Sequence, residues 1–130
     1  MKKTTISLLN FLIAAFAIGF ITERSWAQDP TKVDAKHYKV VSENDSVRVL
    51  RITYGPHEKS VMHEHPNGVA VFLSDFSGRF TLPDGKTVDM TGKAGDAVWS
   101  PGGKHLPENL GDKVFELILV ELKPHMAKKK

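Results

Sequence analysis

Short segments of β-forming residues, each ended by a Gly, Pro or Asn turn, recur along the chain from residue 46 onward. Residues 47–54 are rich in β-branched and aromatic side chains. Residues 69–73 form an apolar run too short for a comfortable helix, which predicts a strand buried on both faces. The turn Pro83-Asp84-Gly85 joins the two halves of a predicted hairpin. No segment after residue 27 shows sustained helical periodicity. The sequence therefore predicts roughly eight or nine short strands in an all-β sandwich or barrel.

The first 27 residues have the features of a secretory signal peptide. Lys2 and Lys3 give a short basic start, residues 6–21 are almost wholly apolar, and small residues occupy the positions before a cleavage point after Ala27. The apolar run is shorter than the ~20 residues that a membrane-spanning helix needs. We therefore expect cleavage after Ala27, a periplasmic or secreted product, and no stable membrane association after cleavage.

The remainder of the chain has the length and composition of one domain. We expect a polar lead-in with an exposed His37 over residues 28–45, a barrel over residues 46–123, and a basic tail over residues 124–130. Residues 1–27 hold three of the 18 basic and one of the 15 acidic side chains, so the mature chain is almost neutral. No basic stripe with interleaved aromatics indicates a nucleic-acid partner. The chain has no cysteine, which excludes disulfides, thiolate metal sites and thiol nucleophiles.

Two histidines lie one position apart in the segment Val61-Met62-His63-Glu64-His65-Pro66. Because strand side chains alternate between faces, His63 and His65 share one face. Neutral imidazole is a common ligand of divalent metals, but two imidazoles alone make a poor site. His105 follows a Pro-Gly-Gly turn about 40 residues later, and antiparallel pairing can place it beside the first two. The alternative is a pair of surface histidines on a half-exposed strand.

From about residue 47 to residue 122 the chain resembles small single-domain cupins of the cupin-2 type. The first cupin motif joins a glycine, a His-x-His pair, a glutamate and a closing glycine; the matching residues are Gly55, His63, His65 and Gly78. The second motif is Gly-x5-Pro-x-Gly, a histidine and an asparagine; with one residue fewer before the histidine, the matching residues are Gly95, Pro101, Gly103, His105 and Asn109. The resemblance implies a double-stranded β-helix, or jelly-roll, barrel whose three histidines hold a metal. It also implies a homodimer.

The glutamate ligand of the first motif has no counterpart in this chain. The corresponding residues are Val69, Ala70 and Val71, none of which can bind a metal. Glu108 and Glu116 remain as candidates for an additional ligand, or for an acid or base, but each can equally be an exposed or ion-paired residue. Without them the site consists of three histidines with open coordination positions.

A metal held by three neutral imidazoles keeps its full charge, which makes it a stronger Lewis acid and a better anchor for an anionic or bidentate ligand. Similar three-histidine cupins include iron dioxygenases that act on cysteine-type thiols and on β-diketones. We therefore expect a divalent metal, with Fe, Zn, Mn, Cu and Ni not distinguished, and a small organic acid or related molecule as substrate or ligand. Phe72 and Trp99 are expected to line the pocket.

Three functional interpretations remain open from the sequence. The first is a dioxygenase-like enzyme, and the second is a non-catalytic module that binds a metal or small ligand. The third is a cupin that has lost its metal and keeps the histidines as pocket lining. No catalytic acid or base is assigned, because Glu108 and Tyr54 are candidates by residue type only.

The signal-peptide interpretation predicts that the exported protein begins at Gln28. Mass spectrometry of protein recovered from its own compartment should show the loss of residues 1–27. A full-length product retained in the membrane would contradict this prediction.

Overall fold

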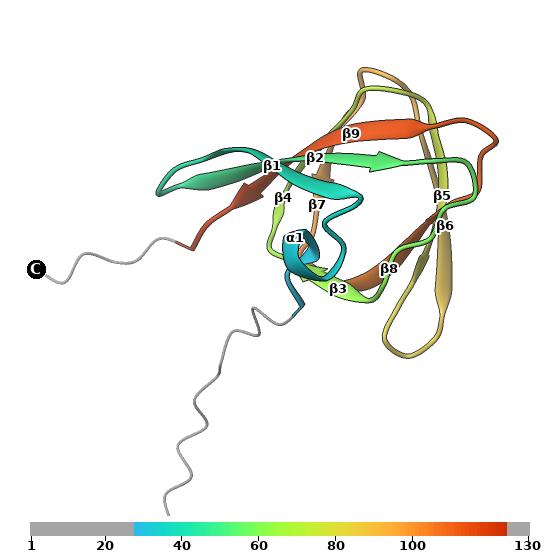
Figure 1. Ribbon diagram of the computed structural model, residues 1–130, viewed down its shortest axis with the longest axis horizontal. Helices are drawn as coiled ribbons and strands as arrows, with labels where there is room; N and C mark the ends of the chain where they lie inside the picture. The colour runs from blue at the N-terminus through green and yellow to red at the C-terminus, as the bar shows by residue number, and fades with distance from the viewer. Residues whose placement is uncertain (1–27, 125–130) are drawn as a thin grey trace, which may run out of the picture.

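The computed structural model describes residues 28–124 as one short helix and nine strands (Figure 1). In chain order the elements are α1 (Pro30–Val33), β1 (Tyr38–Glu43), β2 (Val47–Tyr54), β3 (His63–His65), β4 (Gly68–Phe72), β5 (Phe76–Thr81), β6 (Thr87–Gly92), β7 (Ala97–Ser100), β8 (Gly103–Asn109) and β9 (Phe115–Leu122). The predicted signal peptide and residues 125–130 of the predicted tail lie outside the described residues. Within residues 28–124, the helical content includes nothing long and apolar enough to cross a membrane.

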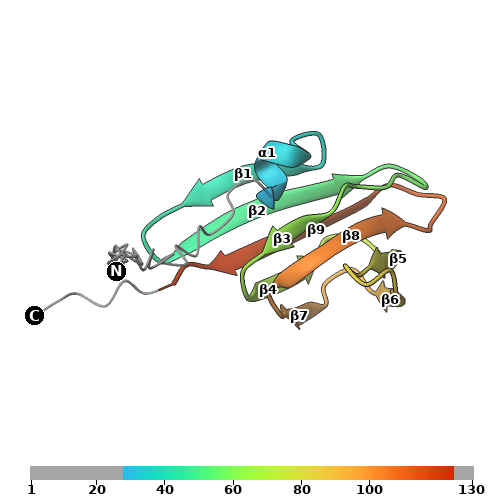
Figure 2. The ribbon, with the colours of Figure 1, turned by 90° about the horizontal axis from the view of Figure 1, so that it is seen from below.

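The strands form two antiparallel sheets that pack as layers (Figure 2). The larger sheet has the order β1-β2-β9-β4-β7, and the smaller one has the order β3-β8-β5-β6. The last strand, β9, lies between β2 and β4 and pairs with both. This arrangement confirms the prediction of an all-β fold of short strands. It also means that both edges of β9 pair with strands far away in the sequence.

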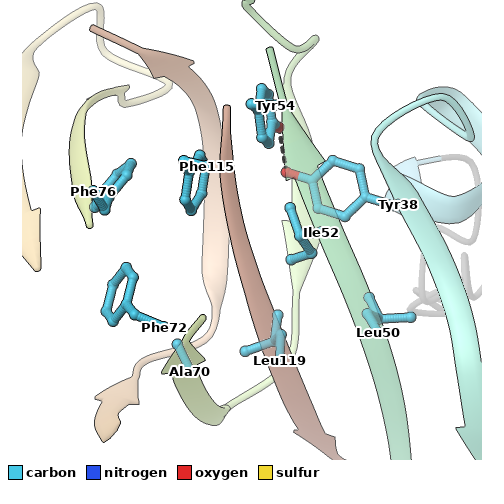
Figure 3. Close-up of a cluster of buried hydrophobic side chains, with 9 residues drawn as sticks. All are labelled: Tyr38, Leu50, Ile52, Tyr54, Ala70, Phe72, Phe76, Phe115 and Leu119. Carbon is cyan, nitrogen blue, oxygen red and sulfur yellow. Dashed lines mark hydrogen bonds between the residues drawn. The ribbon is translucent and has the colours of Figure 1, made fainter. Parts of the chain in front are cut away.

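The core lies between the sheets and is built on the alternation of β2 and β9 (Figure 3). Leu50 pairs with Leu119 and Tyr54 pairs with Phe115, and all four side chains are buried. Because strand side chains alternate, every second residue of both strands enters the core while the intervening residues face outward. Tyr38 of β1 joins this core through a hydrogen bond of 2.6 Å between its hydroxyl and that of Tyr54.

The two seams between the sheets differ in their cover. At one seam, α1 contacts both β1 and β3, which are edge strands of the larger and the smaller sheet (Figures 1 and 2). At the other, the edge strands β6 and β7 are exposed along nearly their whole length. Apolar side chains on these strands, including Trp99 at 57% exposure, have no such cover within the described residues. The barrel is therefore closed at the α1 seam and open at the β6/β7 seam.

The structure differs from the sequence prediction over residues 28–45. These residues contain α1 and β1 instead of an unpatterned lead-in, and His37 is buried instead of exposed. The strand was missed because only Tyr38 of its six residues is buried, so no alternation of apolar and polar residues marks it. Residues 69–73 were expected to be buried on both faces, but β4 alternates between buried and half-buried positions, and Leu73 is exposed.

Candidate metal centre

Antiparallel pairing of β3 with β8 brings the three predicted histidines together. His63 and His65 share the inner face of β3, and His105 of β8 lies directly opposite His63. The ring centroids are 4.9 Å apart for His63 and His65, 5.0 Å for His63 and His105, and 5.4 Å for His65 and His105. One nitrogen of each ring lies within 4.8 Å of the others. The residues of the predicted site thus form one cluster of potential ligand atoms.

Hydrogen bonding fixes which nitrogen His63 offers to the cluster. Its Nδ1–H donates to the backbone carbonyl of Val61 at 2.8 Å, so the Nε2 atom carries the free lone pair. The residue is fully buried, and Nε2 has no hydrogen-bond partner among the described residues. Leaving a buried polar atom unpaired costs roughly 1–3 kcal/mol. A metal ion at this point would supply the missing partner.

His65 is oriented by a buried carboxylate. Its Nδ1–H donates to Oε1 of Glu121 at 2.6 Å, which leaves its Nε2 atom for the cluster. The other oxygen of Glu121 accepts a 2.6 Å hydrogen bond from Nε of Arg48. Burial works against the ionised form of Glu121, but the hydrogen bonds from His65 and Arg48 lower the carboxyl pKa overall. Glu121 is therefore a charged residue that holds His65 through its second nitrogen.

The same chain of contacts reaches the N-terminal helix. Arg48 also donates through a terminal guanidinium nitrogen to Asp29 at 2.6 Å. Asp29 is the N-cap of α1, where its carboxylate accepts hydrogen bonds from the backbone N–H and the hydroxyl of Thr31. We call Asp29, Arg48 and Glu121 the carboxylate relay. It links the orientation of His65 to the segment that closes the covered seam.

A second polar group lies behind His63. The Ser60 hydroxyl donates to Asp34 and lies 3.4 Å from Nδ1 of His63. Asp34 also accepts from Nδ1 of His37 at 2.7 Å, and Nε2 of His37 lies 2.9 Å from Glu58. Hydrogen bonds from Lys36, the Gly55 backbone and His37 lower the pKa of Glu58 to about 2. The segment predicted as a lead-in therefore supplies much of the polar support behind the cluster.

His105 is held by an aromatic neighbour and is kept neutral by its surroundings. Its ring stacks on Phe80 with centroids 4.7 Å apart and an interplanar angle of 12°. Burial, together with the neighbouring imidazoles, lowers the pKa of His105 to about 3. For the same reasons the pKa of His63 falls to about 4. Neutral imidazole is the form that binds a metal, so His63 and His105 are in their ligating form at neutral pH.

A cavity of about 330 Å³ adjoins the cluster, with His65 and His105 in its lining. Phe72 and Trp99, the predicted pocket residues, both line it, with Phe72 buried and Trp99 exposed at the opening. Four rings form what we call the aromatic wall: Phe72, Phe76, Phe80 and Phe115. Of the three residues in place of the missing glutamate, Ala70 alone lines the cavity in the described structure.

The two candidate carboxylates lie apart from the cluster of ligand atoms. Glu116 faces outward and binds Arg51 at 2.9 Å and the hydroxyl of Thr53 at 3.2 Å. Glu108 lies opposite Arg79 and alternates on β8 with the inward-facing Pro107. Asp89 raises the pKa of Arg79, and the charge of Glu108 adds to this effect. Among the described residues, the grouped metal-binding side chains are the three histidines without either glutamate.

Sequence reasoning missed Glu121, although the sequence contains a signal for it. In β9 the residues at odd positions, Phe115, Leu117 and Leu119, face the core, and Glu121 continues the same alternation. A carboxylate in phase with an apolar strand face must find buried partners. Arg48 continues the inward face of β2 in the same way and lies opposite Glu121. Glu116 lies on the opposite face of β9, so alternation alone distinguishes it from Glu121.

The donor set fits a divalent first-row metal. Three imidazoles suit Zn, Cu, Fe or Ni, and ligating histidines usually donate their second N–H to a carboxylate or a backbone carbonyl. His65 donates to the carboxylate of Glu121, and His63 donates to the backbone carbonyl of Val61. His63 has the orphaned buried nitrogen that such an ion would satisfy.

Neither a protein-family model nor a curated protein matches the sequence. Solved structures do resemble the fold. A cupin domain from Bordetella pertussis has a TM-score of 0.62 and 24% identity, covering 67% of this chain and 92% of its own. A conserved protein with a double-stranded β-helix domain from Klebsiella pneumoniae has a TM-score of 0.53 and 25% identity, covering 69% of this chain and 77% of its own. An RmlC-like cupin-family protein from Methanocaldococcus jannaschii has a TM-score of 0.53 and 18% identity, covering 65% of this chain and 77% of its own. The chain therefore has the all-β double-stranded β-helix fold of cupins.

The lowered histidine pKa values predict acid sensitivity of the metal-free protein. Unfolded histidines take up protons near pH 6.5, whereas folded His63 and His105 do so only near about 4 and about 3. The unfolded state therefore binds more protons across this interval, and the free energy of unfolding should fall as pH drops from about 6.5 to about 4. In denaturant titrations, His105→Gln should make this fall shallower. Equal slopes for His105→Gln and the parent protein would contradict the assignment.

The carboxylate relay predicts a specific loss of metal affinity. Arg48→Met leaves Glu121 with one fewer partner and frees the orientation of His65, so metal affinity should fall by roughly 10–100-fold. The matched control is Arg51→Met, because Arg51 also joins β2 to a glutamate of β9 but on the outer face. Calorimetric titration with Zn(II) should separate the two variants. Equal affinities for both would show that the relay does not position His65.

Proposed function

We propose that the protein binds a divalent metal ion through His63, His65 and His105 and binds a small organic molecule at the open coordination positions. The observation that carries this proposal is the buried Nε2 atom of His63, which lacks a partner among the described residues and lies beside two other imidazoles. A pocket of structural histidines would more simply pair this nitrogen with a donor. The adjoining cavity gives a bound molecule access to the same point.

Dioxygenase-like chemistry is the activity that we propose for the metal-loaded protein. A bound divalent ion supplies Lewis acidity and, if it is iron, a centre for reaction with O₂. The protein would hold the ion with neutral ligands, orient His65 through Glu121, and restrict water with the aromatic wall. Among the described residues the ligand group includes no carboxylate, which leaves the positive charge of the ion available for an anionic head group.

One observation favours non-catalytic binding as the second candidate. Besides Ser100, the hydroxyls of the lining belong to Tyr38 and Tyr54, and burial raises the pKa of both. Each hydroxyl therefore keeps its proton and is a poor general base at neutral pH. Turnover would depend on the metal and the substrate for proton transfer, whereas simple binding needs no base.

We also propose that the mature domain works outside the cytoplasm as a homodimer. Residues 1–27 support export, and the metal would then be acquired where the affinity order favours Cu and Zn over Fe and Mn. The resemblance to small cupins supports the dimer. A barrel of short strands exposes strand edges, which a strand of a second copy can cover.

Metal analysis of protein matured in its own compartment tests the metal site. We expect about one ion per chain in the parent protein and in His57→Ala, and none in the double variant His63→Ala/His105→Ala. Unchanged metal content in the double variant would contradict the site. An oxygen-consumption screen with small acids, thiols and diketones on the iron-loaded protein then separates the enzyme from the binding module.

A further inference from the structure

We infer that the ligand of this site has a ring-sized apolar body and one compact oxygen-donor head, and is not a polyanion or a sugar. The inference rests on the proposed function, because the head is what the metal would bind. It deepens that proposal by assigning the chemical class of the molecule. The cavity wall, its polar groups and its opening each carry part of the argument.

An unbroken series of rings leads away from the histidine cluster. Phe80 stacks on His105, the Phe76 ring follows at 6.4 Å from Phe80, and Phe72 follows at 5.5 Å from Phe76. Phe115 packs on Phe76 with centroids 4.5 Å apart. Aromatic faces and edges favour offset or edge-on contact with another ring. A molecule whose head lies at the histidines would therefore lay its body along the aromatic wall.

The inner cavity has few groups that could match further polar atoms of a ligand. The lining has three hydroxyls. One belongs to Ser100 at the end of β7, and those of Tyr38 and Tyr54 bond to each other at 2.6 Å, so that pair has only one remaining proton to donate. The charged residues of the lining, Lys104 and Glu108, alternate along β8 with His105 and Pro107, which face inward. A second carboxylate or a row of hydroxyls on the ligand would be buried without partners, which is unfavourable.

The opening of the cavity is apolar, like its wall. Its exposed lining includes Val88 and Met90 of β6 and Val98 and Trp99 of β7. These residues lie at the open seam, so a ligand would enter over an apolar rim. The volume of about 330 Å³ accommodates a six-membered ring with substituents, since a dry apolar cavity of ~150 Å³ already binds benzene.

A pair of probes with the same head tests the inference. Acetohydroxamate and benzohydroxamate present the same two oxygens and differ in a methyl and a phenyl group. We expect benzohydroxamate to bind the Co(II)-loaded protein at least roughly tenfold more tightly, by titration of the cobalt absorption bands. Val88→Glu should reduce this ratio by placing a charge at the rim, whereas Val41→Glu, at an exposed valine of β1 outside the lining, should leave it unchanged.

A metal-free arm keeps the two proposals distinguishable. Calorimetric titration of the metal-free protein with benzene should show saturable binding that Val41→Glu retains. If Co(II) binds but the two hydroxamates bind equally, the ligand class is overturned while the metal site stands. If Co(II) does not bind, the proposed function fails, and benzene then decides the ligand class alone: binding supports it and no binding overturns it.

Discussion

The hydrogen bonds around the Glu121 carboxylate are the interaction on which the site most depends. The side chain is 1% exposed and carries a charge, and it would be strongly destabilising without its partners. His65 and Arg48 each occupy one of its oxygens at 2.6 Å. Removing one partner of such a buried group typically costs about 3–5 kcal/mol. The same hydrogen bonds therefore orient His65, a proposed metal ligand, and stabilise the pairing of β2 with β9.

The division of the barrel into a covered and an open seam separates two tasks. On the α1 side, charged and hydrogen-bonding side chains fix the imidazoles from behind. On the β6/β7 side, the cavity opens through apolar residues with almost no charge. Rigid support and ligand access thus come from opposite edges of the two sheets. This arrangement allows the opening to vary in sequence without disturbing the groups that hold His63 and His65.

Much of the fold and the central residues of the site could be predicted from sequence because they depend on local patterns. Alternation and turn residues predicted the strands. The spacing of His63 and His65 placed them on one face, and the resemblance to cupins added His105. Motif residues such as Asn109 have an architectural role, since its amide donates to the carbonyls of Gly55 and Lys113. The residues behind the site escaped prediction for two reasons. His37 and Asp34 lie in a segment without periodicity, and the partnership of Glu121 with Arg48 depends on pairing between strands 73 positions apart.

The position of Asp29 has a practical consequence for anyone who expresses this domain. A recombinant chain begun at residue 46, where the sequence pattern of the barrel starts, would retain all three histidines but lack Asp29, Asp34 and Tyr38. Arg48 would lose one of its two carboxylates, and the ring of Tyr38 would no longer pack 4.8 Å from that of His63. Such a truncated protein could fold, yet its measured metal affinity would be lower than that of the full domain. The first residues after the predicted cleavage point therefore belong in any preparation whose metal content is to be measured.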